Sequence, residues 1–277
     1  MRSRLLLATV VLAVTAACGG SSTDCVSTAT DPCTNPGGGG GGNVSTGFVT
    51  KTTVDGSSTY AYKVFIPANY NASTAKIPVI VFMHGSGEKG SDNVSQTNVG
   101  LGPLVKANAS TFPSIVVFPQ GPDGEGPPYN ETFDRITVAA LDKTLTEYTK
   151  ADPTRVYLTG LSYGGIRGYE VAYRNPAKFA AWVPISATIC APCLSAGATQ
   201  QQGFQLAAQG LKTVPIWEFH GQLDSQVSVN DSRAIETAFK GNGDPYTLTV
   251  YATGGHGIWD QVYARADLWT WLYQQKR

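Results

Sequence analysis

The sequence predicts an α/β protein whose mostly parallel central sheet carries helices on both faces. Short, continuous apolar runs at residues 77–83 and 114–118 are typical of strands buried on both sides. Segments with apolar residues at helical spacing alternate with such runs along the chain. In sheets of this kind functional groups gather on loops beyond the carboxyl ends of the strands, so candidate residues are sought there.

The elements follow in a regular order. Residues 59–66 alternate tyrosines with β-branched residues and stop at Pro67, as a strand does. Residues 132–150 form a helix with one apolar side, made by Ile136, Ala139, Ala140 and Leu145. Further strands are predicted at residues 155–159, 180–185, 214–219 and 246–251, and further helices at 163–174, 228–239 and about 259–275. No long insertion separates the strands, so no large lid is expected.

The N-terminal residues predict export. A basic start, an apolar run over residues 5–14 and small residues at 15–17 describe a signal peptide spanning residues 1–17. The stretch resembles a bacterial lipoprotein signal, in which the cysteine that follows, here Cys18, receives lipid. Thr15 departs from the larger aliphatic residue usual three positions before that cysteine, so simple cleavage and secretion stays open. Residues 18–45 are expected to form a Gly/Ser-rich flexible tether, and residues 46–277 the single folded domain.

Charge and cysteine content narrow the function classes. The 20 basic and 20 acidic residues balance, which argues against nucleic-acid binding, and the only expected membrane contact is a lipid at Cys18. In an oxidising compartment Cys25–Cys33 and Cys190–Cys193 would form two local disulfides, although the second pair could instead be a redox centre. Too few nitrogen and sulfur ligands lie near these cysteines for a zinc site. No cofactor is expected.

The pentapeptide Gly160-Leu161-Ser162-Tyr163-Gly164 is the one Gly-x-Ser-x-Gly in the chain. A predicted strand ends immediately before it and a predicted helix begins immediately after it. Such a sharp turn needs glycines and lifts the serine oxygen clear of the sheet, so Ser162 is the candidate nucleophile. The alternative is a tight Gly-Ser turn without function.

A serine hydroxyl needs a base, and the chain has three histidines. In α/β-hydrolases the order is serine, acid, histidine, and only His256 follows Ser162 with room for an acid between them. Asp224, on the loop after a strand, is the preferred acid over Asp231 and Asp244. The remaining histidines, His84 and His220, are expected to brace loop backbones.

Two backbone donors are expected to stabilise a tetrahedral oxyanion: the N–H of Tyr163, directly after the nucleophile, and the N–H of Ser86 in the His84-Gly-Ser-Gly87 loop. Trp259 and His84 are candidate substrate-binding residues. Residues 121–129 could also wall the cleft, and Trp259 could instead anchor the last helix in the core.

These segments resemble the carboxylesterase, phospholipase and dienelactone hydrolase-like group of the α/β-hydrolase superfamily, near secreted feruloyl and polyhydroxybutyrate esterases and predicted peptidases. The resemblance is carried by residues 84–93, 152–165, 220–224 and 255–260, and covers roughly residues 63–275. It implies the α/β-hydrolase fold and a metal-free serine hydrolase that cleaves esters. Tyr163 departs from the methionine or glutamine often found there, which puts the floor of the acyl pocket in doubt.

The resulting expectation is an exported serine hydrolase of carboxylic esters that works through an acyl-enzyme. Short-chain or aryl acyl groups are expected, with acyl groups carried on polysaccharide as a candidate. A peptidase or amidase with the same triad, and a catalytically silent binding module, are the alternatives. The oligomeric state is left open.

Overall fold

The computed structural model describes residues 43–124 and 131–277. The expected signal peptide, Cys18, Cys25, Cys33 and all but the last residues of the expected tether lie outside this part of the chain. So does most of the 121–129 segment that was expected to wall the cleft. Asn43–Arg277 forms one compact unit, and the description below concerns that unit.

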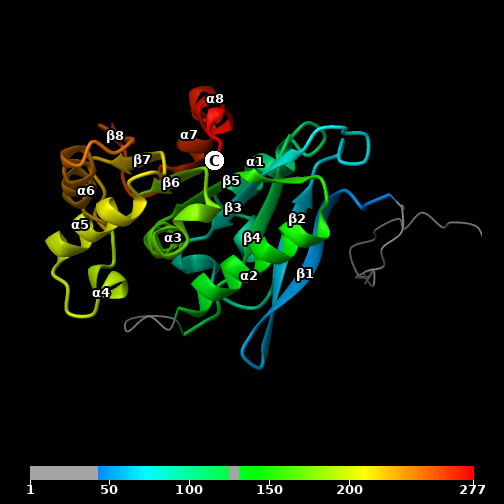
Figure 1. Ribbon diagram of the computed structural model, residues 1–277, viewed down its shortest axis with the longest axis horizontal. Helices are drawn as coiled ribbons and strands as arrows, with labels where there is room; N and C mark the ends of the chain where they lie inside the picture. Colours follow the sequence, from blue (N-terminus) through cyan, green and yellow to red (C-terminus); the bar gives the residue numbers. More distant parts are fainter. Residues whose placement is uncertain (1–42, 125–130) are drawn as a thin grey trace, which may run out of the picture. The chain divides into compact units, whose positions relative to one another are not determined.

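A mixed sheet runs through the centre of this unit (Figure 1). Its strands lie in the order β1-β2-β4-β3-β5-β6-β7-β8. β1 pairs antiparallel with β2, and β2 with β4, while every later pair is parallel. The strands are β1 (Gly47–Asp55), β2 (Ser58–Ile66), β3 (Ile77–Met83), β4 (Ile115–Pro119), β5 (Ala151–Leu161), β6 (Ala181–Ile185), β7 (Ile216–Gly221) and β8 (Tyr246–Tyr251).

Helices cover both faces of the sheet. One face packs against α2 (Thr132–Glu147), α3 (Tyr163–Arg174), α5 (Gln200–Leu211) and α6 (Val229–Gly241). The other face packs against α1 (Leu101–Ala107), α7 (Trp259–Tyr263) and α8 (Ala266–Gln274). The short α4 (Ala191–Leu194) precedes α5, and single 3₁₀ turns lie at η1 (Ser86–Glu88), η2 (Ser95–Thr97) and η3 (Pro176–Lys178).

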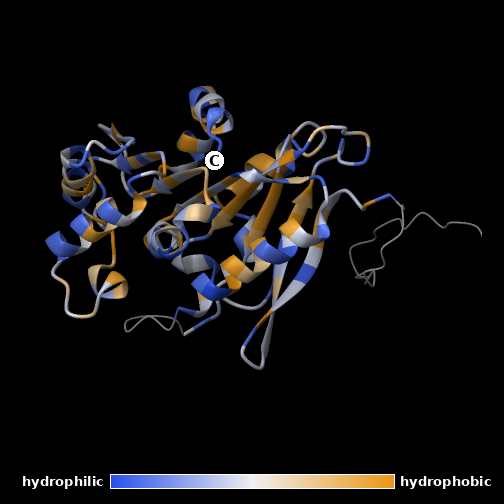
Figure 2. Ribbon diagram, in the orientation of Figure 1, coloured by the Kyte–Doolittle hydropathy of each residue, from blue (hydrophilic) through white to orange (hydrophobic). Residues whose placement is uncertain are grey.

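The two apolar layers arise from the alternation of side chains along each strand. In β3, Val79, Val81 and Met83 face the α2–α3 layer, and Ile80 and Phe82 face the α1–α8 layer. Figure 2 shows the strands at the centre of the sheet as the most hydrophobic part of the ribbon. The sheet is therefore buried on both sides where its parallel strands end, which provides a rigid base for the loops that follow.

The structure confirms the predicted fold class. Residues 77–83, 163–174 and 246–251 have the predicted bounds. The prediction of a single closing helix over about residues 259–275 was wrong. α7 ends at Tyr263, and the extended backbone of Arg265 precedes a separate α8. Among the described residues no helix is long and apolar enough to cross a membrane.

Candidate active site

Ser162 occupies the turn between β5 and α3. Its backbone has φ 50° and ψ −118°, a conformation that L residues rarely adopt. The neighbouring glycines permit this turn, because a Cβ on Gly164 would lie 2.2 Å from the carbonyl oxygen of Met83 and one on Gly160 would lie 2.6 Å from that of Gly164. The end of β3 therefore approaches the turn so closely that only hydrogen fits at Gly164.

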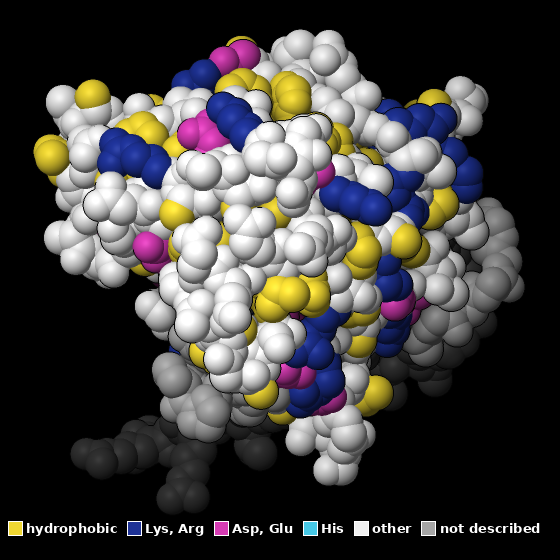
Figure 3. Space-filling view, turned by 60° about the vertical axis from the view of Figure 1, so that its left-hand side comes forward, with side chains coloured by type: hydrophobic (Ala, Val, Ile, Leu, Met, Phe, Trp, Pro, Cys, Tyr) yellow, Lys and Arg dark blue, Asp and Glu magenta, His cyan; other side chains and the backbone are white. Residues whose placement is uncertain are grey.

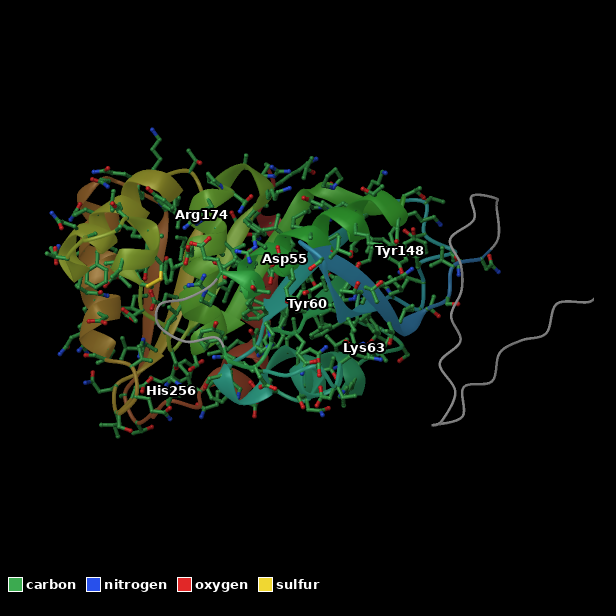
Figure 4. All side chains as sticks on the ribbon, turned by 90° about the horizontal axis from the view of Figure 1, so that it is seen from below. Asp55, Tyr60, Lys63, Tyr148, Arg174 and His256 are labelled. Carbon is green, nitrogen blue, oxygen red and sulfur yellow. A yellow bond between two sulfur atoms is a disulfide. The ribbon has the colours of Figure 1, made fainter. Side chains whose placement is uncertain are left out.

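Two loops bring a histidine and a carboxylate to this serine. His256, on the loop between β8 and α7, has its Nε2 2.8 Å from Ser162 Oγ. Its Nδ1 lies 2.7 Å from Oδ2 of Asp224, on the loop after β7. Figure 4 shows His256 at the lower left of the view, away from Arg174 and Tyr148 in the upper half. The structure thus brings the three residues predicted as nucleophile, base and acid into one hydrogen-bonded row.

Asp224 is surrounded by donors. Its Oδ1 accepts from the N–H groups of Gln226 and Val227, at 2.8 and 2.9 Å. Burial alone would raise the pKa of Asp224, but the bonds from Val227, His256 and Gln226 outweigh it and lower the pKa below its usual value. The carboxylate therefore stays ionised and keeps its orientation toward His256.

The backbone around His256 is also held. Ser186, at the end of β6, has φ 49° and donates from Oγ to the His256 carbonyl oxygen at 2.7 Å. The N–H of Leu223 donates to the Gly254 carbonyl oxygen at 2.8 Å, which ties the two loops together. A Cβ on Gly221 would lie 2.0 Å from the Gly255 carbonyl oxygen, so the close approach of the loops requires glycine there.

The two residues predicted to supply oxyanion donors, Tyr163 and Ser86, lie close to Ser162 in the chain or in space. Tyr163 is the first residue of α3, whose N-terminus and positive dipole end point toward the serine. Ser86 is the first residue of η1, and a Cβ on the preceding Gly85 would lie 3.9 Å from Ser162 Cβ. The His84–Gly87 loop therefore lies against the nucleophile, where its backbone can approach a bound carbonyl group.

Tyr163 is buried in an aromatic stack. Its ring lies parallel to that of Phe133, with centroids 5.9 Å apart, and Phe133 in turn contacts the ring of His84 at 4.6 Å. Lys89 Nζ lies 4.0 Å from the centre of the Tyr163 ring. This stack therefore joins the start of α3 to the His84–Gly87 loop.

The expectation that His84 binds substrate is wrong, because its ring is bonded to backbone groups inside the protein. The side chain is fully buried, with Nδ1 2.6 Å from the Gly85 carbonyl oxygen and Nε2 accepting from the Gly121 N–H at 2.8 Å. Desolvation, and to a lesser extent the charge of Lys89, lower the pKa of His84 to about 4. A neutral ring that joins two loop backbones fits the bracing role that was also predicted for it.

Trp259 packs in the core as one of its two expected roles requires, and it also contacts the triad. Its half-buried ring packs against the α1–α8 layer of the core. The same ring meets that of His256 edge-on, with centroids 5.8 Å apart and an angle of 90° between the ring planes. Trp259 can therefore orient the imidazole of His256.

The two competing acids lie elsewhere. Asp231 is in the first turn of α6 and accepts a hydrogen bond from Thr188 Oγ1 at 2.7 Å. Asp244 precedes β8 in a turn, where its N–H donates to the Phe239 carbonyl oxygen at 3.1 Å. Neither is bonded to His256, which leaves Asp224 as its carboxylate partner.

The predicted Cys190–Cys193 disulfide is present, with its Cα atoms 5.2 Å apart. It lies beside a buried ion network between α2 and α3, in which Arg167 binds Asp134 at 2.6 Å and Glu170 at 2.8 Å. Burial raises the pKa of Asp134 to about 7, against the opposing charge of Arg167. This network joins the helices behind Ser162.

The contact between His220 and the triad carboxylate was not predicted from the sequence. His220 Nε2 lies 3.1 Å from Asp224 Oδ2, the same oxygen that faces His256. The spacing His220-Gly-x-x-Asp224 was the available signal, because a strand end followed by a tight turn returns residue i+4 toward residue i.

No group of three or more His, Cys, Asp or Glu side chains in the described ranges is arranged to hold a metal ion. On the face in Figure 3, Lys and Arg side chains lie in small groups, several beside Asp or Glu, and apolar side chains are scattered between them. The chemistry that the described site offers is nucleophilic attack by an activated serine.

Comparison with known proteins places this site in context. The family model "Dienelactone hydrolase family" matches residues 128–265. A bifunctional acetylxylan esterase/xylanase of Neocallimastix patriciarum is 25% identical over 209 residues, which cover 75% of this chain and 27% of that protein. The chain therefore spans about a quarter of the length of this relative.

Solved structures share the fold. A thermostable esterase superposes with a TM-score of 0.65 and 28% identity, over 83% of this chain and 63% of that one. A ferulic acid esterase gives a TM-score of 0.56 with 19% identity, over 82% of this chain and 97% of that one. At that identity the second similarity concerns the fold alone.

Proposed function

The chain belongs to the α/β-hydrolase superfamily and carries a domain of the dienelactone hydrolase family, and from this premise we propose that it is a serine hydrolase of carboxylic esters. The observation that carries the proposal is the row Asp224–His256–Ser162, with contacts of 2.7 and 2.8 Å. This is the arrangement by which a base activates a serine hydroxyl. The similarity to a protein named acetylxylan esterase/xylanase supports esters as the substrate class.

The reaction proceeds in two halves. Ser162 Oγ attacks the ester carbonyl carbon while His256 Nε2 takes the hydroxyl proton, and the carbonyl electron pair moves onto its oxygen. The N–H groups of Tyr163 and Ser86 stabilise that oxyanion. When the intermediate collapses, the bond to the alcohol oxygen breaks, His256 gives the alcohol its proton, and an acyl group remains on Ser162.

Water then replaces the alcohol. His256 takes a proton from the water, whose oxygen attacks the acyl carbon, and collapse returns the proton to Ser162 Oγ with release of the acid. Asp224 accepts the Nδ1–H of His256 throughout, so it holds the required tautomer and stabilises the imidazolium.

We propose short-chain or aryl acyl groups as the substrates, with acyl groups on polysaccharide as a natural source. In the described ranges no long insertion between the strands could act as a lid, which supports an open site. The N. patriciarum relative is named for acetylated xylan, which supports a small acyl group on a polymer.

The test compares the wild type with Ser162→Ala on p-nitrophenyl esters from acetate to decanoate. We expect the short esters to turn over, and the variant to lose about four to six orders of magnitude in kcat. Ser57→Ala is the matched control, because Ser57 is exposed in the turn between β1 and β2. Equal inertness of wild type and Ser162→Ala would remove the ester proposal and favour peptide anilides or a binding role.

We also propose that the chain is exported and held at a membrane by lipid on Cys18. In the producing cell, Cys18→Ser should move the protein from the membrane fraction to the soluble exported fraction, because a membrane anchor of acyl chains is lost. Fractionation and the mass of the mature N-terminal peptide measure this. If the wild type is already soluble and lacks lipid, cleavage and secretion replace anchoring.

A further inference from the structure

His220 is a fully buried histidine that contacts the triad carboxylate from behind. Its Nε2 is 3.0 Å from the Val227 carbonyl oxygen and 3.1 Å from Asp224 Oδ2. Its Nδ1 is 2.6 Å from Ser232 Oγ, on α6. Both ring nitrogens therefore have polar neighbours inside the protein.

The contacts continue to a second buried carboxylate. Ser232 Oγ donates to Glu218 Oε1 at 2.5 Å. Glu218 Oε2 accepts from the hydroxyl of Tyr169 on α3 at 2.8 Å, and from that of Tyr246 on β8. Glu218 and His220 are two residues apart in β7, so both side chains lie on the same face of the sheet.

The protons in this chain of contacts can be counted. The Val227 carbonyl and the ionised Asp224 only accept, so Nε2 of His220 carries a proton. Glu218 receives three hydroxyl donors, the environment of a carboxylate, and one of the three protons comes from Ser232. Since Ser232 has a single proton, its oxygen faces Nδ1 as an acceptor, and Nδ1 must be protonated too.

We propose that His220 is a buried imidazolium that joins Glu218 to Asp224 and positions the triad carboxylate. The inference rests on the proposed function at Ser162 and adds a positioning residue to it. The positive ring is held between two carboxylates, directly at Asp224 Oδ2 and through Ser232 at Glu218. It keeps that oxygen ionised and in place for His256.

Electrostatics support this charge state. Burial alone would lower the pKa of His220, but the charge and bonding of Glu218, the Val227 carbonyl and the Asp224 charge raise it above its usual value. The charged groups that face His220 are Glu218 on its own strand and Asp224 on the next loop, with His256 beyond Asp224. From α6 it meets Ser232, while the nearby Asp231 is bonded to Thr188.

The imidazolium also tunes the base. A positive charge behind Asp224 weakens the attraction of that carboxylate for a proton on His256. Removing the charge should therefore move the acid limb of the activity profile to higher pH. A purely structural role for His220 would change the amount of folded protein and leave that limb in place.

The charge of the His220 ring can be measured directly by ¹⁵N NMR of the whole protein. The chain has three histidines, so ¹⁵N-labelled rings are assignable with single His→Gln variants. At roughly pH 8, well above the ordinary histidine pKa, we expect both nitrogens of His220 to be protonated, whereas His84 shows an unprotonated Nε2. An unprotonated nitrogen on His220 at that pH overturns the inference, whatever the activity on esters.

The kinetic test uses the rate at which a fluorophosphonate labels Ser162, which requires no particular ester. Ser232→Ala and His220→Gln should label about 10- to 100-fold more slowly, with the acid limb about half to one pH unit higher. Thr237→Ala removes an exposed hydroxyl from the same helix and should match the wild type. Slower labelling without a shifted limb overturns the positioning role. Labelling without turnover of any ester instead refutes the proposed substrate class alone.

Discussion

The φ of 50° at Ser162 places a non-glycine residue where backbone strain costs of order 1–3 kcal/mol. The surrounding contacts hold it there: the N–H of Ser162 donates to the Ile185 carbonyl oxygen, and its carbonyl oxygen accepts from Ile166. The strain lifts Oγ toward His256. At the scale of single residues, the backbone geometry at Ser162 thus determines where the nucleophile lies.

Asp224→Asn tests the proposed acid at this scale. An amide keeps the shape of the side chain but offers His256 an N–H donor, which favours the wrong imidazole tautomer. We expect kcat/KM on short esters to fall about 10³- to 10⁴-fold. Steady-state kinetics measures this loss. Asp231→Asn is the matched control, because the carboxylate of Asp231 bonds Thr188 and not His256. Equal losses in the two variants would argue against Asp224.

Residue order and motifs were sufficient to name the three side chains that the structure brings together. They could not reveal burial. His84 was a candidate for substrate binding, and only the fold shows that backbone groups contact both its nitrogens. The contact of His220 with Asp224 was hidden for the same reason, since it depends on how the loop after β7 turns.

At the scale of elements, close packing constrains the sequence of the turn from β5 into α3. Gly164→Ala would place a methyl group 2.2 Å from the Met83 carbonyl oxygen and 2.4 Å from that of His84. Although alanine favours helices, we expect this variant to lose about 2 kcal/mol or more of unfolding free energy, because β3 must shift. Urea unfolding measures it.

Gly241→Ala supplies the comparison. Gly241 ends α6, and a Cβ there would have no neighbour within 4 Å. We expect this variant to be neutral or slightly more stable than the wild type. If the two alanine variants had the same stability, packing against β3 would not be the reason for glycine at position 164.

Elements with a strong periodic pattern were predictable, and elements that depend on tertiary packing were not. β1 was missed because this edge strand, with one buried residue, lacks a continuous apolar run. α5 was missed because it is rich in glutamine, although Thr199 and Gln202 form a capping box at its start. The break between α7 and α8 has no proline or glycine, and arises where the backbone of Arg265 becomes extended.

At the scale of the whole unit, the buried side chains of His220 and His84 have opposite effects on how the unfolding free energy depends on pH. The raised pKa of His220 contributes stability that is present below the unfolded-state value and lost as pH rises through the folded value. The lowered pKa of His84 acts the other way. The unfolded chain binds a proton at His84 below its ordinary pKa, while the folded protein does not until about pH 4.

The expected consequence is a loss of unfolding free energy between about pH 6.5 and pH 4, worth about 3 kcal/mol from His84 alone. His84→Gln has no such proton to bind, so its stability should fall less steeply over this window even if it is lower at neutral pH. Carboxylates that also respond in this range are common to both proteins and cancel in the difference. Urea unfolding at several pH values measures the two slopes. Parallel slopes would mean that His84 takes up its proton in the folded state, and that the bond from the Gly121 N–H does not keep its Nε2 unprotonated.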